Sequence, residues 1–220
     1  MGNLHHQQHI LQLSIRQEEE TRALISKLDK SDLVSLDFQV NYFGMMSKMI
    51  AYQARNDLFC FIANYHSMTS INDKSELEKN TKDAFIDLLA LGINPDRSTF
   101  WVQSHVPEVA ELARILSNYA SVGLMQRSPS YKDKIANGLK PNMGLFSYPI
   151  LMASDILLFQ SDSVPIGKDQ KQHLEMTRDI AIKFNNSFGD VFTIPEIEID
   201  KSNDVVVGID DRKMSKSYNN

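Results

Sequence analysis

The 220-residue sequence contains one cysteine, Cys60, so it cannot form an internal disulfide. Disulfide frameworks are typical of secreted proteins, and a single cysteine inside the apolar run 58–63 favours a reducing, intracellular setting. The first residues, MGNLHHQQH, are polar and lack the apolar core of a secretory signal. We therefore expect a cytoplasmic location, or the matrix of an organelle.

Long apolar runs and an excess of positive charge are also lacking. The longest apolar stretch, 143–159, is interrupted by Pro149 and Asp155, so we expect no membrane span. The net charge of −5 provides no general basic field for nucleic acid, although a local patch can suffice. With 42% hydrophobic residues, the chain can bury one sizeable core.

The hydrophobic pattern predicts helices that alternate with strands. An amphipathic helix is predicted over 7–29, and a Met-rich helix over about 42–54, where the methionine stripe indicates core packing. Ser75 and Glu78 form a capping box for a helix that ends at Gly92, Pro107 opens another, and a third runs from Asp169 to about Asn186. Strands are predicted at 34–40, 58–63, 99–103, 163–166, 191–194 and 205–207. This order predicts an α/β fold with a mostly parallel sheet and helices on both faces.

Tyr148, Met152 and Asp155 are spaced i, i+4 and i+7, so they share one face of a predicted helix. A carboxylate on an otherwise apolar face needs a partner. A backbone amide or an arginine would satisfy it. An indole N–H held between an aromatic ring and a thioether would also fit. The spacing leaves both interpretations open.

Two further segments follow predicted strands. Residues 167–170, Gly-Lys-Asp-Gln, lie between a strand and a helix, where backbone amides favour anionic or ribose ligands; a plain helix cap is the alternative. His66 follows the strand 58–63 and is either a structural histidine or a substrate contact. The cluster His5, His6 and His9 has no further ligand candidates nearby, so we expect a polar terminus and no protein-bound metal.

The pentapeptide Lys213-Met214-Ser215-Lys216-Ser217 places two lysines around a small hydroxyl residue. Such a loop suits a polyphosphate, because ammonium groups neutralise the charge that develops as pyrophosphate leaves a nucleotide. By itself it could equally be a solvated basic loop. Its position downstream of the block 144–175 favours the phosphate interpretation.

Together, the pentapeptide, the Y-P-x-L-M-A-x-D segment 148–155 and residues 167–170 resemble the tryptophanyl-tRNA synthetases, which are class I aminoacyl-tRNA synthetases. The resemblance covers about 41–220 and implies a Rossmann-like catalytic core. It also implies ATP-dependent activation of L-tryptophan, transfer to tRNA(Trp), Mg²⁺ on the nucleotide, and a homodimer. The sister tyrosine family shares the fold and the lysine loop, but the Y-P-x-L-M-A-x-D-I-L block favours tryptophan.

The resemblance assigns roles to individual residues. Asp155 would read the indole nitrogen, with Tyr148 and Met152 as pocket walls and Gln170 and His66 as further tryptophan contacts. Lys213 and Lys216 would be catalytic by stabilising the leaving pyrophosphate. The ATP site would comprise Gly167, Lys168, Asp169, Val205, Lys134 and the lysine loop with Met214, Ser215 and Ser217.

The sequence departs from the family at residues 1–40, an atypical N-terminal segment. The family has an H-[IL]-G-[NH] signature where this chain has Phe38-Gln39-Val40-Asn41, and no glycine lies between Gly2 and Gly44. Family members also continue past the lysine loop into an anticodon-binding domain. We therefore expect inefficient charging of tRNA. A catalytically impaired tryptophan-binding or dimerising module is the alternative function.

Overall fold

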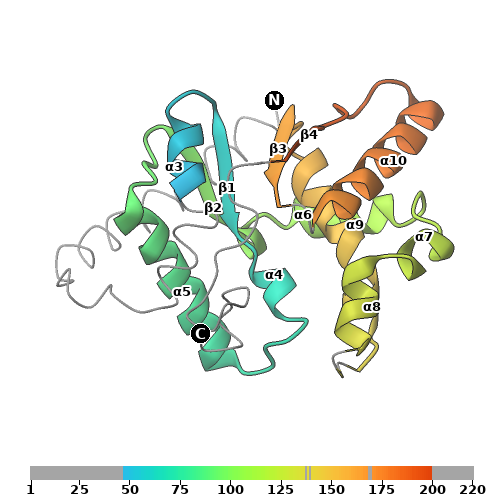
Figure 1. The fold of residues 1–220 in the computed structure, drawn as a ribbon, viewed down its shortest axis with the longest axis horizontal. Helices are drawn as coiled ribbons and strands as arrows, with labels where there is room; N and C mark the ends of the chain where they lie inside the picture. Colours follow the sequence, from blue (N-terminus) through green and yellow to red (C-terminus); the bar gives the residue numbers. More distant parts are fainter. Residues whose placement is uncertain (1–46, 137, 139, 168–169, 200–220) are drawn as a thin grey trace, which may run out of the picture. The chain divides into compact units, whose positions relative to one another are not determined.

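The computed structural model describes residues 47–199, with the exception of 137, 139, 168 and 169 (Figure 1). The predicted helix 7–29 and the predicted strands 34–40 and 205–207 lie outside these residues. The chain divides into two compact units. The described part of the first unit comprises 47–64 and 73–102, and that of the second comprises 65–72 and 103–199.

The first unit is built on two parallel strands, β1 (Leu58–Ile62) and β2 (Ser98–Val102). Both lie within one residue of their predicted bounds. The helices α3 (Ser47–Gln53) and α5 (Lys74–Leu91) pack against β1. Met49 of α3 packs against the buried core around Cys60 and Phe100, so the methionine stripe serves core packing, as predicted, at this position.

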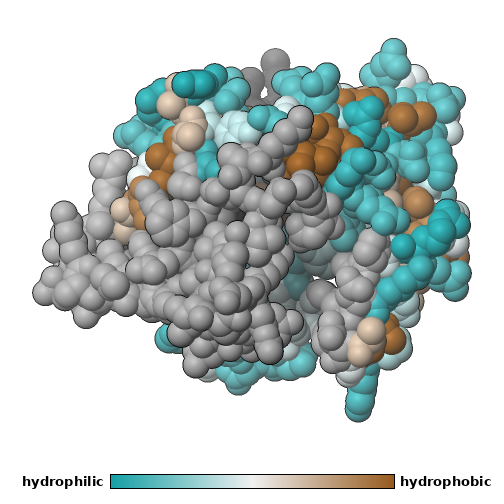
Figure 2. Space-filling view, in the orientation of Figure 1, coloured by the Kyte–Doolittle hydropathy of each residue, from teal (hydrophilic) through white to brown (hydrophobic). Residues whose placement is uncertain are grey.

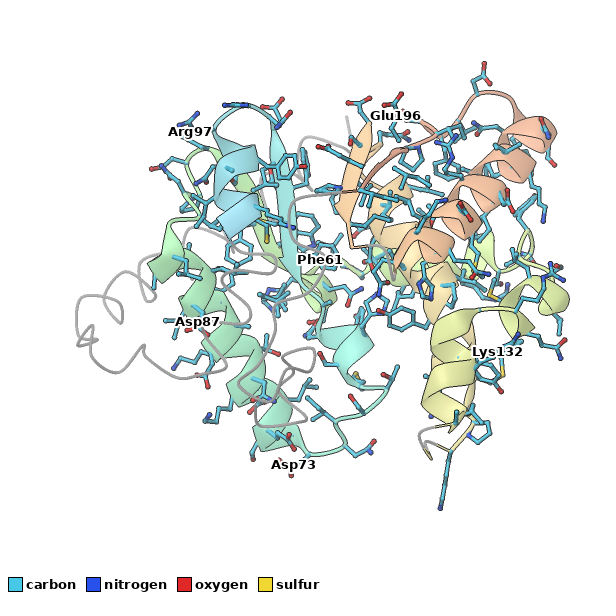
Figure 3. The ribbon with its side chains drawn as sticks, viewed as in Figure 1. Phe61, Asp73, Asp87, Arg97, Lys132 and Glu196 are labelled. Carbon is cyan, nitrogen blue, oxygen red and sulfur yellow. The ribbon has the colours of Figure 1, made fainter. Side chains whose placement is uncertain are left out.

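The predicted capping box of α5 is wrong. The N-cap is Asp73, whose Oδ1 accepts a hydrogen bond from the backbone N–H of Glu76 at 2.8 Å (Asp73 is labelled in Figure 3). Asp73 has the extended conformation of a capping residue, whereas Ser75 lies within the first turn. The predicted end is confirmed, because Gly92 adopts φ 114°, a left-handed conformation that favours glycine.

The second unit contains another parallel pair, β3 (Ser163–Ile166) and β4 (Glu196–Ile199). The prediction of β3 is confirmed, but the strand predicted at 191–194 is wrong. Asn185 Oδ1 accepts the backbone N–H groups of Val191 and Phe192, and Gln160 Oε1 accepts that of Thr193. These amides are bound to side chains, so they do not enter a strand ladder.

In the second unit, the helix α9 (Met143–Leu157) packs against α6 (Glu108–Leu116) and α10 (Lys171–Phe188). Pro107 is the N-cap of α6. The helix α10 begins and ends two residues later in the chain than predicted. The shorter elements are α4 (Asn64–Ser67), the 3₁₀ turn η3 (Gln103–His105), α7 (Val122–Gln126) and α8 (Pro129–Ala136). α9 supplies Ile150, Ala153 and Leu157 to the core of this unit, which burial of apolar surface stabilises.

Hydrophilic atoms dominate the visible surface of α10 in Figure 2, with a few hydrophobic atoms among them. Its exposed apolar side chains are Ile182 and Phe188. Within the described ranges, no helix has the length and apolar character needed to cross a membrane.

Candidate functional site

The carboxylate of Asp155 is the polar centre of the second unit. Its side chain is only 3% exposed, in the interior of α9 between the core residues Ala153 and Leu157. Asn142 caps this helix by accepting the backbone N–H of Leu145 at 2.8 Å. A carboxylate in such surroundings is stable only when several donors satisfy it.

Two side chains supply these donors, and neither is the arginine or backbone amide considered from the sequence. Gln103 Nε2 lies 2.8 Å from Asp155 Oδ1 and 2.9 Å from Oδ2. His66 Nε2 lies 2.9 Å from Oδ2. Because a carboxylate oxygen accepts hydrogen bonds, His66 donates here when Asp155 is ionised.

The sequence pattern predicts Gln103 only as the last residue of a strand and assigns it no role in the site. It is fully buried, and its Oε1 accepts the backbone N–H of Tyr65 at 3.0 Å. The available signal was its place in the chain: Gln103 directly follows β2, as the segment with His66 follows β1. Residues that follow parallel strands are the usual source of ligand-binding side chains in α/β proteins.

The ring of Tyr148 contacts two histidine rings. Its ring centroid is 4.3 Å from that of His66 and 5.9 Å from that of His173 on α10. His173 is buried, and its Nε2 lies 3.3 Å from Ser128 Oγ. Met152 is half-buried on the same helix, one turn after Tyr148. The structure thus brings His66 of α4 together with Tyr148 and Asp155 of α9, and places Met152 on α9 as well.

The segment after β3 is described in part. Gly167 is exposed, and its carbonyl accepts the backbone N–H of Gln170, which is the N-cap residue of α10. Lys134 belongs to α8, where the neighbouring Lys132 is exposed (labelled in Figure 3). The remaining predicted nucleotide contacts, Lys168, Asp169, Val205 and residues 213–217, lie outside the described residues.

The arrangement is suited to binding a flat ligand with one polar edge. Tyr148 and His66 supply aromatic rings, and the Asp155 carboxylate supplies a fixed acceptor bound to His66. In the part of the chain that the structure describes, no group of three histidine, cysteine or acidic side chains is placed to hold a metal ion.

The sequence matches proteins of known function. The family model of the class I tRNA synthetases (W and Y) matches residues 38–220. The tryptophan--tRNA ligase of Campylobacter jejuni is 53% identical over 180 residues, which are 82% of this chain and 56% of that protein. The enzyme of Fusobacterium nucleatum is 54% identical over 181 residues, with the same coverage. The chain spans just over half the length of these curated relatives.

Solved structures show the same likeness. The crystal structure of Campylobacter jejuni tryptophanyl-tRNA synthetase complexed with ADP and tryptophan matches with a TM-score of 0.78 and 53% identity. It covers 81% of this chain and 56% of that one. The Mycoplasma pneumoniae enzyme matches with a TM-score of 0.76 and 35% identity, over 81% of this chain and 54% of that one. These matches confirm the expected α/β, Rossmann-like class. Because the family model spans most of the sequence, including the whole described region, this chain belongs to the class I tRNA synthetases of the tryptophan and tyrosine group.

Proposed function

We propose that this chain carries the amino-acid activation chemistry of a tryptophan--tRNA ligase. The reaction is ATP-dependent formation of tryptophanyl-adenylate from L-tryptophan, followed by transfer to tRNA(Trp). The observation that carries the proposal is the buried Asp155 carboxylate, fixed beside the rings of Tyr148 and His66. It combines with the 53–54% identity to tryptophan--tRNA ligases.

Binding of tryptophan would use the residues of the second unit. The indole N–H would donate to Asp155, and the ring would contact Tyr148, Met152 and His66. Gln170, half-buried at the start of α10, would contact the amino-acid end of the substrate. A buried charged acceptor rewards a ligand that carries a matching donor, because an apolar analogue leaves it unpaired.

Binding of ATP would use the segment after β3 and the lysine loop. Gly167, Lys168 and Asp169 would contact the nucleotide together with Val205 and Lys134. Met214, Ser215 and Ser217 would line the loop, in which Lys213 and Lys216 would stabilise the leaving pyrophosphate. Mg²⁺ would be bound by the nucleotide phosphates.

The tRNA substrate, the location and the oligomeric state are inferred from the family. We propose tRNA(Trp) as the macromolecular substrate, a cytoplasmic or organellar-matrix location, and a homodimer. Met49 and Ile50 are partly buried and pack against the core of the first unit. Sedimentation of the chain at tens of micromolar, roughly the range that populates an obligate dimer, tests this proposal. Detection of the monomer alone would contradict the homodimer.

The deciding experiment is ATP–pyrophosphate exchange by the 220-residue chain, measured with tryptophan and with tyrosine. Exchange that depends on tryptophan supports the proposal. Exchange with tyrosine alone would establish the sister specificity instead. Calorimetric binding of tryptophan without exchange would support the second candidate, a tryptophan-binding module. That candidate is favoured by Phe38-Gln39-Val40 in place of the family's H-x-G signature.

A further inference from the structure

The side-chain amide of Gln103 can face Asp155 in only one orientation. Its Oε1 accepts the backbone N–H of Tyr65 at 3.0 Å, so its Nε2 is the end that faces the carboxylate. The residue is fully buried, and water therefore does not compete for either end. Gln103 links the backbone beside His66 to the carboxylate on α9.

The hydrogen bonds of Asp155 are unequally shared between its two oxygens. Oδ2 is approached by Gln103 Nε2 and by His66 Nε2, each at 2.9 Å. Among the residues that the structure describes, Oδ1 is approached by Gln103 Nε2 alone, at 2.8 Å. Since each carboxylate oxygen can accept about two hydrogen bonds, the acceptor capacity that remains is on Oδ1.

We propose that Gln103 is a positioning residue for recognition of the indole N–H. Together with His66 it occupies Oδ2 and directs Oδ1, with one acceptor position left, toward a ligand that carries a single N–H donor. This inference rests on the proposed function, in which Asp155 receives that donor. Gln103 itself does not touch the reacting atoms; it acts through Asp155.

Gln103→Glu tests the donor role with little change of shape. Glutamate can still accept the N–H of Tyr65, but it presents an oxygen to Asp155 in place of the Nε2 donor. Two carboxylates at this distance repel when both are ionised, and they share a proton at lower pH. The shared proton restores a hydrogen bond of the lost kind, so the defect should be partly reversed as the pH falls.

The readout is the preference for L-tryptophan over its benzothiophene analogue, in which sulfur replaces the indole N–H. Calorimetry on the full chain should show that the unsubstituted protein prefers tryptophan by about tenfold or more. Gln103→Glu should lose most of this preference at about pH 8 and regain part of it at about pH 6. Its affinity for the analogue should stay near that of the unsubstituted protein, because the ring contacts are intact.

Gln53→Glu is the matched control. Gln53 is also buried, donates to the carbonyl of Gly92 and accepts the N–H of Asn94, but has no hydrogen bond to Asp155. The Gln53→Glu substitution should lower the free energy of unfolding without changing the preference for tryptophan over the analogue at either pH. Should Gln103→Glu fail to fold, Gln103→Asn replaces it, since the side chain is one methylene too short to reach both partners.

Three results would overturn the inference. The first is an unchanged preference in Gln103→Glu or Gln103→Asn. The second is tryptophan binding by the unsubstituted protein without preference over the analogue, which would leave tryptophan binding intact but remove Asp155 as the acceptor. The third is absence of tryptophan binding altogether, which would overturn the proposed function itself.

Discussion

The Nε2 atom of His66 lies 2.9 Å from Oδ2 of Asp155, although the two residues are 89 positions apart in the chain. When the carboxylate is ionised, Oδ2 can only accept a hydrogen bond, so Nε2 of His66 must carry the proton. The contact therefore sets the tautomer of His66. Its Nδ1 is buried and has no hydrogen-bond partner among the described residues. The pair orients both the ring that faces Tyr148 and the carboxylate on α9.

Replacement of Asp155 should weaken tryptophan binding. Asp155→Ala removes a buried, charged acceptor, so we expect a loss of roughly 1–3 kcal/mol in binding free energy, measured by calorimetry. The donors on Gln103 and His66 would also lose their partner, and the melting temperature should fall. Asp83→Ala, on the surface of α5, is the control and should change neither quantity by much. Unchanged affinity in a folded Asp155→Ala protein would remove Asp155 from the site.

The two candidate caps of α5 can be separated by mutation. Asp73→Ala should lower the free energy of unfolding by about 1 kcal/mol, because the backbone N–H of Glu76 loses its acceptor. Ser75→Ala should have a smaller effect, since alanine is favourable within a first turn. Urea unfolding of both variants measures the difference. An equal or larger loss for Ser75→Ala would return the cap to the position predicted from the sequence.

The face of α9 that carries the site could be predicted, but its partners could not. Periodicity placed Tyr148, Met152 and Asp155 together because helical spacing is local. Gln103 and Asp155 are 52 positions apart, and hydrophobic patterns do not state which distant residues meet. A short apolar run in the sequence is also compatible with either a core strand or a loop whose backbone is bound by side chains. The apolar residues 191–194 illustrate this, because Asn185 and Gln160 bind their backbone.

Cys60 should make the folded protein less stable as the pH becomes alkaline. Burial raises the pKa of its thiol from 9.0 to about 12, because the thiolate loses its hydration inside the β1–β2 core. The unfolded chain therefore releases this proton first. The contribution to stability is complete below about pH 9 and is lost as the pH rises from there toward 12.

The effect of Cys60 is isolated by Cys60→Ala. The difference in unfolding free energy between the parent and Cys60→Ala should narrow by about 1 kcal/mol between about pH 8 and about pH 10. Urea unfolding at both pH values measures it, and the difference cancels the titration of lysine and tyrosine residues elsewhere. A difference that does not vary with pH would show that the thiol ionises as readily in the folded protein as in the unfolded chain.

The last prediction concerns positions 38–41, where the family signature is replaced by Phe38-Gln39-Val40-Asn41. In the family this signature holds ATP, and its glycine lets the backbone approach the nucleotide. The double substitution Phe38→His and Val40→Gly should therefore raise tryptophan-dependent ATP–pyrophosphate exchange, by on the order of 10²-fold, through better positioning of the adenine and ribose of ATP.

Tryptophan affinity should be unchanged by the double substitution, because the proposed tryptophan contacts are His66 and residues within 148–170. A version that also carries Asp155→Ala is the control, and its exchange should fall because the amino acid is held less well. If the double substitution left exchange at the level of the parent chain while the protein stayed folded, residues 38–41 would not limit ATP positioning. The chain would then have to hold the nucleotide through other residues, and the tryptophan-binding module would lose the observation that favours it.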